Sequence, residues 1–420
     1  MASKKAKKQD KKDEKKGKGK KAEPLDDSAK EKYVRGDPKR VFESALLKGL
    51  RKKYGNHVGT ATGRQPPIPR LSSGIAPLDK HLGGGWAKGY WHVMFGEPSS
   101  SKTTTLLRSL GVAQKTCRNC NVFPLEPKKC GCGNFVPHVV AYIRLEEYDP
   151  QWAARFLDID ALILFEPTSG EEALDILDTC IRTGEVDVIG LDSVAFMTPQ
   201  KEIDGSVGDE FVGLQPRMVG KGVRKANAGL AATALTTKHR PTVFLTNQIR
   251  FKVGVMFGSP VTQPGGQAPL FAAGTEVKFG NGVYKSNKDD DEKNPLYVEF
   301  PYRINKNKTG IAKCEGIYRM ALVNGAFKKL GSVIDEHWMV EQAVTANIIT
   351  KPSDATYVLF GTSYRGVGTL IEALYADPKT TRDLRDTLME YFKQRIASEN
   401  LMLSTQENSD DAMNVGSDDD

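Results

Sequence analysis

The chain lacks the long apolar runs and the apolar leader that membrane and secreted proteins carry. No stretch of its 420 residues is apolar over the length that a membrane-spanning helix needs. Residues 1–22 hold no apolar core, so we predict neither a signal peptide nor a membrane anchor. Cysteine is scarce as well, with six in the chain, and we expect the isolated Cys180 and Cys314 to be core residues. The 39% hydrophobic content still permits the cores of two or three domains.

Charge is concentrated at the two ends of the chain. Residues 1–22 carry eleven lysines and three acidic residues, and this excess equals the formal net charge of +8 of the whole chain. We predict a basic disordered tail over residues 1–36 with nucleic acid as its partner; a tail that only aids solubility is the alternative. The segment 407–420 carries six acidic residues and no basic one. We predict an acidic disordered tail over residues 401–420 that competes with DNA for basic grooves.

A phosphate-binding loop is predicted between a strand and a helix within residues 71–107. The apolar run WHVMF is followed by GEPSSSKT and a helix-like continuation. Backbone N–H groups of such a turn cradle phosphates, while Lys102 would reach the β and γ groups and Thr103 would hold Mg²⁺. Ser101 replaces the second glycine of the usual pattern, and its Cβ must avoid a clash if the backbone needs a positive φ. A chance turn rich in serine and threonine is the alternative. The residues predicted to contact the nucleotide here are Gly96, Glu97, Pro98, Ser99, Ser100, Ser101, Lys102, Thr103 and Thr104.

Three further apolar runs end in polar residues suited to phosphate chemistry. VDVIGLDS carries Asp192, a carboxylate suited to ordering Mg²⁺ through its water shell. VVAYIRLEEYDP presents Glu146 and Glu147, one of which could orient an attacking water, and VFLTNQ places Gln248 near a phosphate. Core strands often end in acidic residues that have no such role. Ligands gather at the carboxyl ends of parallel strands in open α/β sheets, so together these residues predict one site.

These segments resemble the bacterial RecA recombinase family over about residues 40–395. The resemblance rests on GEPSSSKT, VDVIGLDSVAFMTP, EIDGSVGDEFVGLQPRM, TNQIRFKVGVMFG, PGGQA and INKNK, of which other phosphate-loop ATPases share only the first well. It implies an α/β fold, with a RecA-like P-loop ATPase core and a central, mostly parallel sheet over residues 66–330. It also implies an N-terminal helix and strand for oligomerisation at 37–65 and a small α+β C-terminal domain at 331–400.

The resemblance also implies roles for residues near the nucleotide. Glu146 is similar to the catalytic glutamate of the family, and Gln248 is similar to its γ-phosphate sensor. Trp152 resembles the aromatic residue that stacks on adenine, and Asp149 would then lie near the adenine amino group.

A lysine pair resembles the one with which the family completes its active site between protomers. Lys306 and Lys308 match two lysines that reach across to the γ-phosphate of a neighbouring protomer. Positive charge there stabilises the transition state and makes hydrolysis depend on filament assembly. A solvated basic hairpin is the alternative.

By the same resemblance, DNA contacts fall in two loops, around residues 202–213 and 249–266. Both loops are short of aromatic side chains, so contact would rest mainly on backbone phosphates and would read no base sequence. The second loop is rich in glycine and basic residues, and a mobile surface loop with incidental charge is the alternative. The residues predicted to contact DNA are Val212, Arg217, Arg224, Arg250, Lys252, Val253, Gly265 and Gly266, with Arg303 a candidate for a second DNA site.

An insertion at residues 115–138 is the main departure from the family. It holds a C-x₂-C pair and a C-x-C pair, namely Cys117, Cys120, Cys130 and Cys132. Paired cysteines in tight, glycine-flanked turns predict a structural Zn²⁺ site with four thiolates. A disulfide-stapled loop is the alternative, which the intracellular setting implied by the function disfavours. His138 is a further candidate ligand, although a lone histidine near a strand is more often structural.

Together these features predict an ATP-dependent homologous DNA recombinase that forms filaments on single-stranded DNA and catalyses pairing and strand exchange. The expected cofactors are ATP, Mg²⁺ and Zn²⁺. The expected partners are single- and double-stranded DNA, a helical homo-oligomer, and single-strand-binding and loader proteins, with a cytoplasmic location and no membrane. The alternatives are a RecA-like branch-migration motor, and a nucleotide-gated filament that coats single-stranded DNA and hydrolyses ATP weakly. The insertion and the altered phosphate loop also fit a phage-encoded member of the family.

Overall fold

The chain divides into two compact units, Met1–Arg64 and Gln65–Asp420. The structure, a computed structural model, describes residues 45–55, 68–123, 130–236, 240–251, 261–286, 294–325, 328–392 and 394–395. In the first unit the described part is the helix α3 (Ala45–Tyr54) with the residue that follows it. No helix among the described residues is both long and apolar enough to span a membrane.

Several predictions from the sequence fall outside the described residues. They are the tails at 1–36 and 401–420, the strand expected before residue 65, and the DNA contacts of Lys252 and Val253. These stay predictions.

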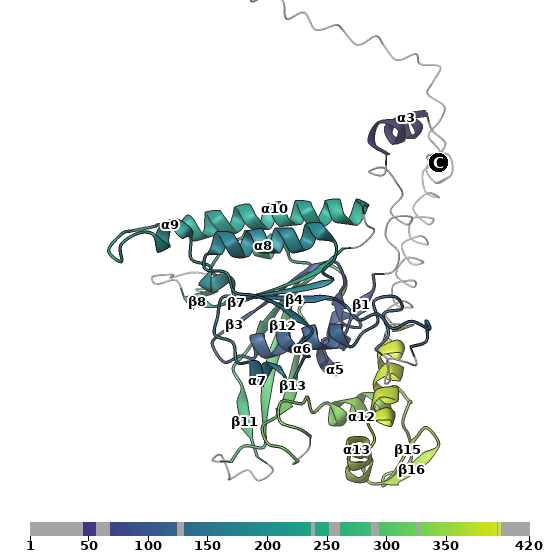
Figure 1. Cartoon of the computed structure of the whole chain (residues 1–420). Coiled ribbons are helices and arrows are strands. Elements are labelled where there is room, and N and C mark those ends of the chain that lie inside the picture. The colour runs from purple at the N-terminus through teal and green to yellow at the C-terminus, as the bar shows by residue number, and fades with distance from the viewer. Residues whose placement is uncertain are drawn as a thin grey trace, which may run out of the picture. The chain divides into compact units, whose positions relative to one another are not determined.

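The second unit is built on a nine-stranded sheet whose central strands are parallel (Figure 1). The strand order is β11-β12-β10-β3-β7-β6-β4-β5, with β13 paired to β12. Every pairing from β10 to β5 is parallel, whereas β12 pairs antiparallel with its three neighbours. This sheet confirms the predicted fold class. The parallel strands are β10 (Thr275–Phe279), β3 (Trp91–Gly96), β7 (Thr242–Gln248), β6 (Val188–Asp192), β4 (Val140–Arg144) and β5 (Leu162–Phe165). The antiparallel strands are β12 (Tyr297–Asn307), β11 (Val283–Lys285) and β13 (Glu315–Ala321).

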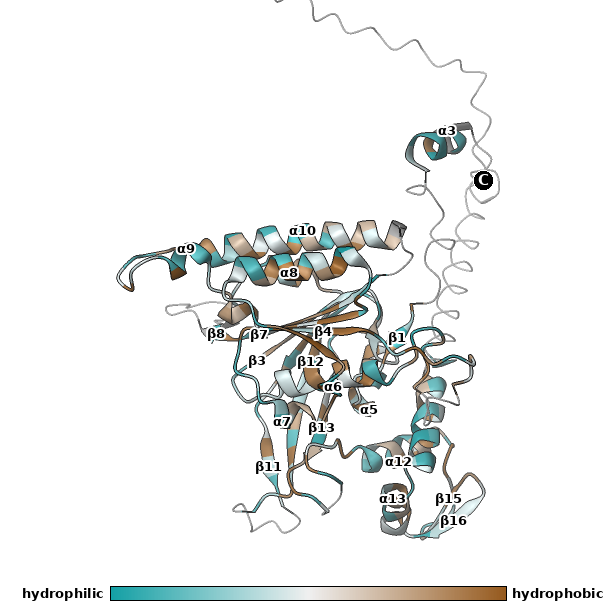
Figure 2. Ribbon diagram, in the orientation of Figure 1, coloured by the Kyte–Doolittle hydropathy of each residue, from teal (hydrophilic) through white to brown (hydrophobic). Residues whose placement is uncertain are grey.

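Helices cover both faces of the sheet. The helices α8 (Gly170–Thr183) and α10 (Leu214–Thr236) pack on one face, and α6 (Lys102–Gln114) packs on the other (Figure 1). Successive side chains of a strand point to opposite faces, so Val93 and Met94 of β3 belong to different cores. Strands buried on both faces are mainly apolar, which is why WHVMF and VDVIGL show no regular polar alternation despite His92 and Asp187 (Figure 2).

Short elements surround this layered core. They are β1 (Arg70–Leu71) paired with β2 (Trp86–Ala87), α5 (Ala76–Leu82), α7 (Pro150–Ala153), η5 (Val194–Phe196), α9 (Gln200–Ile203), β8 (Arg250–Phe251) paired with β9 (Val261–Thr262), and α11 (Ala268–Ala272).

The C-terminal part of this unit has a core of its own. Buried leucines such as Leu370, Leu374 and Leu388 fill it. Arg385 joins this part to α5, beside the central sheet, through an ion pair of 2.7 Å with Asp79. The surrounding elements are α12 (Glu336–Thr345), β14 (Thr350–Ser353), β15 (Thr356–Leu359), β16 (Thr362–Arg365), α13 (Val367–Ala376) and a helix over residues 378–392.

The position of α6 depends on the absence of a side chain at Gly111. A Cβ there would lie 2.0 Å from the backbone oxygen of Phe156, too close for any real contact. We predict that Gly111→Ala lowers the free energy of unfolding by about 3 kcal/mol, because backbone must move to admit the methyl group. Urea unfolding followed by fluorescence measures this loss.

Gly368 of α13 provides the matched control, since a Cβ there meets nothing within 4 Å. Gly368→Ala should stabilise the protein by about 0.5–1 kcal/mol through helix propensity alone. Equal effects of the two substitutions would contradict the close approach at Gly111.

Candidate functional site

The predicted nucleotide residues follow the carboxyl ends of four adjacent parallel strands. Gly96 of β3 lies opposite Gln248 of β7, and Arg144 of β4 lies opposite Asp192 of β6. The register therefore places the phosphate loop, Gln248, Asp192 and the segment carrying Glu146 together at the carboxyl ends of these strands. Open α/β sheets bind ligands in crevices at the carboxyl ends of their strands.

The phosphate loop is closely packed, and Lys102 at its end folds back onto earlier residues of the loop. At Gly96 a Cβ would lie 2.3 Å from the backbone oxygen of Phe279, so only glycine fits there. Lys102 donates to the backbone oxygen of Glu97 at 2.7 Å and to Ser100 Oγ at 3.3 Å. Burial lowers the pKa of Lys102, while the negative charges of Glu146 and Asp192 oppose this shift. A phosphate would offer this ammonium group a charged partner in place of a neutral carbonyl.

Asp192 is fully buried and accepts hydrogen bonds from three hydroxyl groups. Thr103 Oγ1 donates to its Oδ2 at 2.6 Å, Tyr142 OH donates to the same oxygen at 3.1 Å, and Thr246 Oγ1 donates to Oδ1. Burial raises the pKa of Asp192, although the bonds from Thr103 and Thr246 favour the charged form. A carboxylate next to a threonine hydroxyl at the start of a helix is the oxygen ligand set that Mg²⁺ prefers. The structure thus brings the two predicted Mg²⁺ residues into direct contact.

Glu146 lies between Gln248 and Ser193. Gln248 Nε2 donates to Glu146 Oε1 at 3.2 Å, and Ser193 Oγ donates to the same oxygen. Sequence reasoning identified Glu146 and Gln248 but missed Ser193 and the hydroxyl partners Tyr142 and Thr246. Ser193 directly follows Asp192, and this adjacency was the available signal, whereas no motif marks Tyr142 or Thr246.

The residues predicted near adenine lie on or beside the short helix α7. Asp149 caps this helix, and its Oδ1 accepts the backbone N–H of Gln151 at 2.8 Å. Trp152 is half-buried and meets Phe156 edge to face, with ring centroids 5.2 Å apart. Their roles toward adenine stay predictions.

Lys306 and Lys308 are directed away from the phosphate loop of their own chain. Lys306 lies opposite Glu276 of β10, three residues before Phe279, which lies opposite Gly96. This separation is about 10 Å along the strand. Their ammonium groups donate to the backbone oxygens of Leu270 at 2.5 Å and Phe271 at 3.4 Å, at the end of α11.

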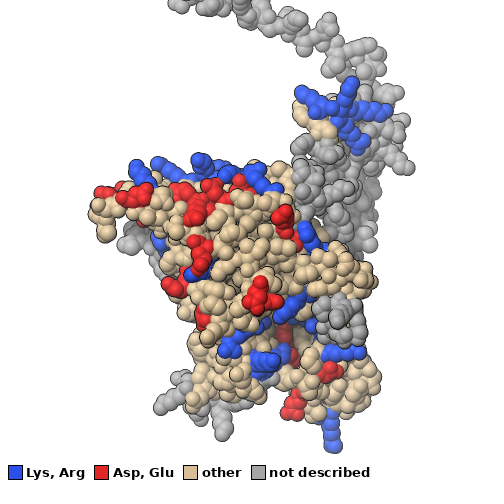
Figure 3. Space-filling view, in the orientation of Figure 1, with Lys and Arg blue, Asp and Glu red and all other residues tan. Residues whose placement is uncertain are grey.

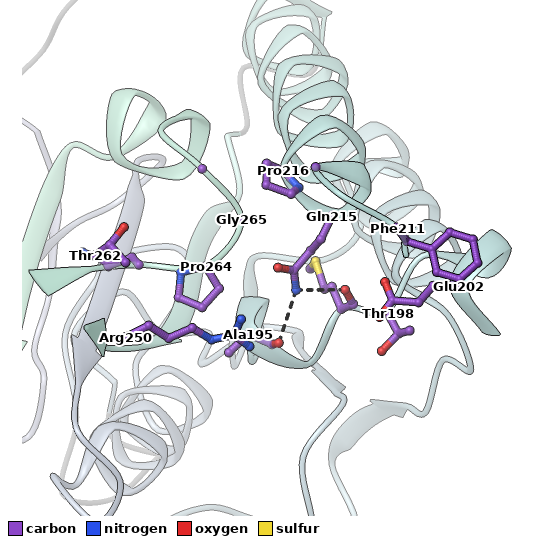
Figure 4. Close-up of a pocket in the computed structure, with 14 residues that line it drawn as sticks. Ala195, Thr198, Glu202, Phe211, Gln215, Pro216, Arg250, Thr262, Pro264 and Gly265 are labelled. Atoms are coloured by element: carbon purple, nitrogen blue, oxygen red, sulfur yellow. Dashed lines mark hydrogen bonds between the residues drawn. The ribbon is translucent and has the colours of Figure 1, made fainter. Parts of the chain in front are cut away.

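The two predicted DNA loops line one pocket of about 570 Å³ (Figure 4). Glu202, Phe211 and Gly213 come from the first loop, while Arg250, Gly265 and Gly266 come from the second. Gln215 forms the floor, and its Nε2 donates to the backbone oxygens of Val194, Ala195 and Met197 at 3.0–3.3 Å. Arg250 is exposed at this pocket.

A polar chain connects the second loop to the strands of the nucleotide site. Asn247 Nδ2 donates to the backbone oxygen of Pro264 at 3.0 Å and to Gln263 Oε1 at 3.3 Å. Gln263 Nε2 in turn donates to Glu276 Oε1 at 2.9 Å. Asn247 precedes Gln248 on β7, so the residue bonded to the loop and the residue bonded to Glu146 are adjacent in the chain. Sequence reasoning missed Gln263 and Glu276, which no motif marks.

Basic residues line the outer face of α10. Arg217, Lys221 and Arg224 follow helical spacing and are exposed, and Figure 3 shows Lys and Arg side chains along this helix. None of the three makes an ion pair within the described part of the chain. Lys221 was missed, although its spacing from the two predicted arginines was the signal. Arg303 differs, because its side chain pairs with Glu315 at 3.0 Å.

The four cysteines of the insertion converge. Their sulfurs all lie within 4.8 Å of one another, and the cysteines are free of disulfides. His138 does not join them, since its ring contacts Asp187 and Lys88.

Comparisons with known proteins identify relatives over most of the chain. The RecA N-terminal domain family matches residues 135–315. Protein RecA of Mesomycoplasma hyopneumoniae strain 7448 is 38% identical over 312 residues, which are 70% of this chain and 84% of that protein. Protein RecA of Corynebacterium efficiens is 33% identical over 318 residues, which are 71% of this chain and 75% of that protein. The crystal structure of the RadB recombinase aligns with 60% of this chain and 96% of the RadB chain, with 18% sequence identity and a TM-score of 0.39. This similarity is too low to support an argument beyond the two RecA relatives.

Ser101 is one of two serines in the phosphate loop with a positive φ, the other being Ser99. The φ of Ser101 is +67°, in the left-handed region that favours glycine, and its side chain makes no cap bond to α6. We predict that Ser101→Gly raises the free energy of unfolding of the nucleotide-free protein by about 1 kcal/mol, since glycine removes the strain of the Cβ. Ser101→Ala keeps the Cβ and should bring no gain. Chemical unfolding of the three proteins decides; a glycine variant no more stable than the parent would show that the loop carries no such strain.

Proposed function

We propose, because the chain belongs to the RecA family of recombinases, that it polymerises on single-stranded DNA with ATP and exchanges strands with a homologous duplex. The observation that carries this proposal is the junction at Asn247 and Gln248. Gln248 contacts Glu146 in the proposed nucleotide site, and Asn247 contacts Pro264 in the wall of the pocket that would face DNA. A protein whose DNA binding responds to its nucleotide needs such a junction.

At the nucleotide edge, the loop amides and Lys102 would bind the phosphates. Thr103 and Asp192 are the residues that would hold Mg²⁺, which neutralises phosphate charge when bound. Glu146 would orient the attacking water, and its contact with Gln248 places an amide where a γ-phosphate could compete for it. Trp152 and Asp149 would contact adenine. ATP, Mg²⁺ and a structural Zn²⁺ at the four cysteines are the cofactors we propose.

At the pocket between the loops, DNA would be held by its phosphates. Arg250 in the pocket wall and Arg217 and Arg224 on α10 supply positive charge, and none of them forms an ion pair with a described residue. Gly265 and Gly266 line this pocket with φ values of +81° and +74°, in the left-handed region that favours glycine, and their backbone amides would contact a phosphate. Such contacts read no bases, so homology would be tested by base pairing between two DNA molecules. The protein would thus act on cytoplasmic DNA of any sequence, and loader and single-strand-binding proteins are expected helpers.

Assembly would complete the active site. Lys306 and Lys308 point to α11 in their own chain, about 10 Å along the sheet from its phosphate loop. They can therefore serve a γ-phosphate only in a neighbouring protomer. Burial, with the nearby charge of Lys308, lowers the pKa of Lys306, so a phosphate would be a better partner than the present carbonyl. A head-to-tail contact of this kind builds a helical homo-oligomer.

Joint-molecule formation tests the proposed function. A labelled single strand and a homologous supercoiled duplex should form D-loops with this protein and ATP, and also with a slowly hydrolysed analogue, because binding and not hydrolysis would drive pairing. Lys102→Ala should abolish both filaments and D-loops. Coating of the single strand without any D-loops would overturn the strand-exchange assignment.

Mixing two inactive variants tests the shared active site. Glu146→Gln and the double variant Lys306→Ala/Lys308→Ala should each lose DNA-dependent ATPase activity by at least about 100-fold, since each removes a group acting on the transition state. In a 1:1 mixture, roughly a quarter of interfaces in a random filament would carry both intact halves. ATPase activity should therefore reappear in the mixture.

The control for this mixture combines Glu146→Gln with Glu146→Ala, which damage the same half of the interface and should not restore activity. Failure of the first mixture, with both variants incorporated in one filament, would place the lysines outside the neighbouring active site.

A further inference from the structure

The four cysteines match the geometry of a tetrahedral thiolate site. Three sulfur pairs lie 3.4–3.7 Å apart, namely Cys117–Cys132, Cys120–Cys130 and Cys130–Cys132. Zn²⁺ with zinc–sulfur bonds of about 2.3 Å holds its sulfurs about 3.8 Å apart. A disulfide would need about 2.05 Å between two sulfurs. The arrangement suits one metal ion better than any pairwise bond.

The cysteine site lies on the side of the sheet where β4 and β6 begin, whereas the nucleotide residues lie where the parallel strands end. The insertion ends at the start of β4, and Arg118 at its beginning pairs with Asp187, just before β6, at 3.0 Å. Glu146 and Asp192 lie at or beyond the other ends of these strands, about 15 Å away. A metal here cannot take part in phosphate chemistry, so its role must be structural.

The insertion is fastened to the core on one side. Asn121 Nδ2 donates to the backbone oxygen of Arg70 in β1 at 2.7 Å, and Asn121 Oδ1 accepts from Lys88 Nζ at 3.0 Å. Asn121 has a φ of +59° and directly follows Cys120, so the turn that presents two thiols also presents this anchor.

On its other side the insertion contacts the helix over residues 378–392. The guanidinium of Arg382 lies 4.3 Å from the ring centroid of Phe123, and its Nη1 donates to the backbone oxygen of Phe123 at 3.3 Å. One turn later Arg385 binds Asp79 and Ser72 of the core at 2.7 Å and 3.0 Å. Ser72 directly follows β1, the strand that Asn121 contacts. Insertion, β1 and C-terminal helix therefore meet at one junction.

We propose that Zn²⁺ bound by Cys117, Cys120, Cys130 and Cys132 makes the insertion a clasp that fastens the C-terminal helix to the ATPase core through Phe123 and Arg382. The described residues of the insertion include few buried apolar side chains, so hydrophobic burial there supplies little of the free energy needed to order it. Metal binding supplies that free energy, as it does in small zinc modules. With the metal removed, Phe123 would no longer be held against Arg382.

Metal content tests the first half of this proposal. The full chain purified under reducing conditions should contain about one Zn²⁺ per protomer by elemental analysis. Cys120→Ser and Cys132→Ser should each lose most of it, whereas Cys314→Ser, outside the cluster, should retain it. Protein without zinc, or with zinc unaffected by both cluster substitutions, overturns the site.

Hydrogen exchange tests the clasp. Chelation of zinc under reducing conditions should accelerate amide exchange in residues 378–392 by roughly tenfold, because the contact between this helix and the insertion is lost. Arg382→Ala should retain its zinc, show the faster exchange at once, and respond no further to chelation. If zinc acts on the helix through the Arg382 contact, removing both zinc and the Arg382 side chain should accelerate exchange no more than removing either one alone.

Lys379→Ala is the matched control, since it removes an exposed positive charge from the same helix. It should exchange like the parent protein and keep its response to chelation. Unchanged exchange of the helix after zinc loss would overturn the clasp even if the metal site stands. Neither result depends on recombinase activity, so failure here leaves the proposed function untouched.

Discussion

Register between the parallel strands is the constraint on which the site depends. Hydrogen bonding aligns the ends of β3 and β7, and of β4 and β6, so that the polar residues at these strand ends lie level with one another. The strands are buried on both faces, and a slip of one residue would exchange the contents of the two cores. The same packing that stabilises the sheet therefore positions Lys102, Glu146, Asp192 and Gln248. Glycine at positions 96 and 111 is the local requirement for bringing backbone this close.

The alternation of side chains along β7 gives one strand two functions. Asn247 and Gln248 point to different sides because successive residues of a strand do so. One is tied to Pro264 and the other to Glu146. A phosphate that drew Gln248 away from Glu146 would strain the strand end that also carries Asn247. This short connection would link the proposed nucleotide and DNA sites without a long path through the protein.

Much of the fold and part of the site could be predicted from local patterns. The apolar run before GEPSSSKT and the run ending in Asp192 identified two buried strands, and the phosphate loop between strand and helix followed from spacing alone. Ser101 was recognised as a departure that matters if the backbone needs a positive φ, and its φ is +67°. By contrast, the Tyr142 and Thr246 hydroxyl groups beside Asp192 and the Gln263–Glu276 bond carry no motif. They meet only because strands far apart in the chain lie side by side, so no local pattern could reveal them.

The sequence by itself determined which chemistry is available: a lysine and a threonine after a glycine turn, acidic residues after buried strands, two lysines two residues apart, and four cysteines in tight turns. These are properties of spacing and residue type, which survive without knowledge of the fold. The tertiary structure decided which groups meet. It brought Thr103 to Asp192, joined both loops in one pocket, and directed Lys306 and Lys308 away from their own phosphate loop. It also placed Arg382 on Phe123, 259 residues earlier in the chain. Such contacts depend on strand order and register, which arise from packing of the whole chain and not from any one segment.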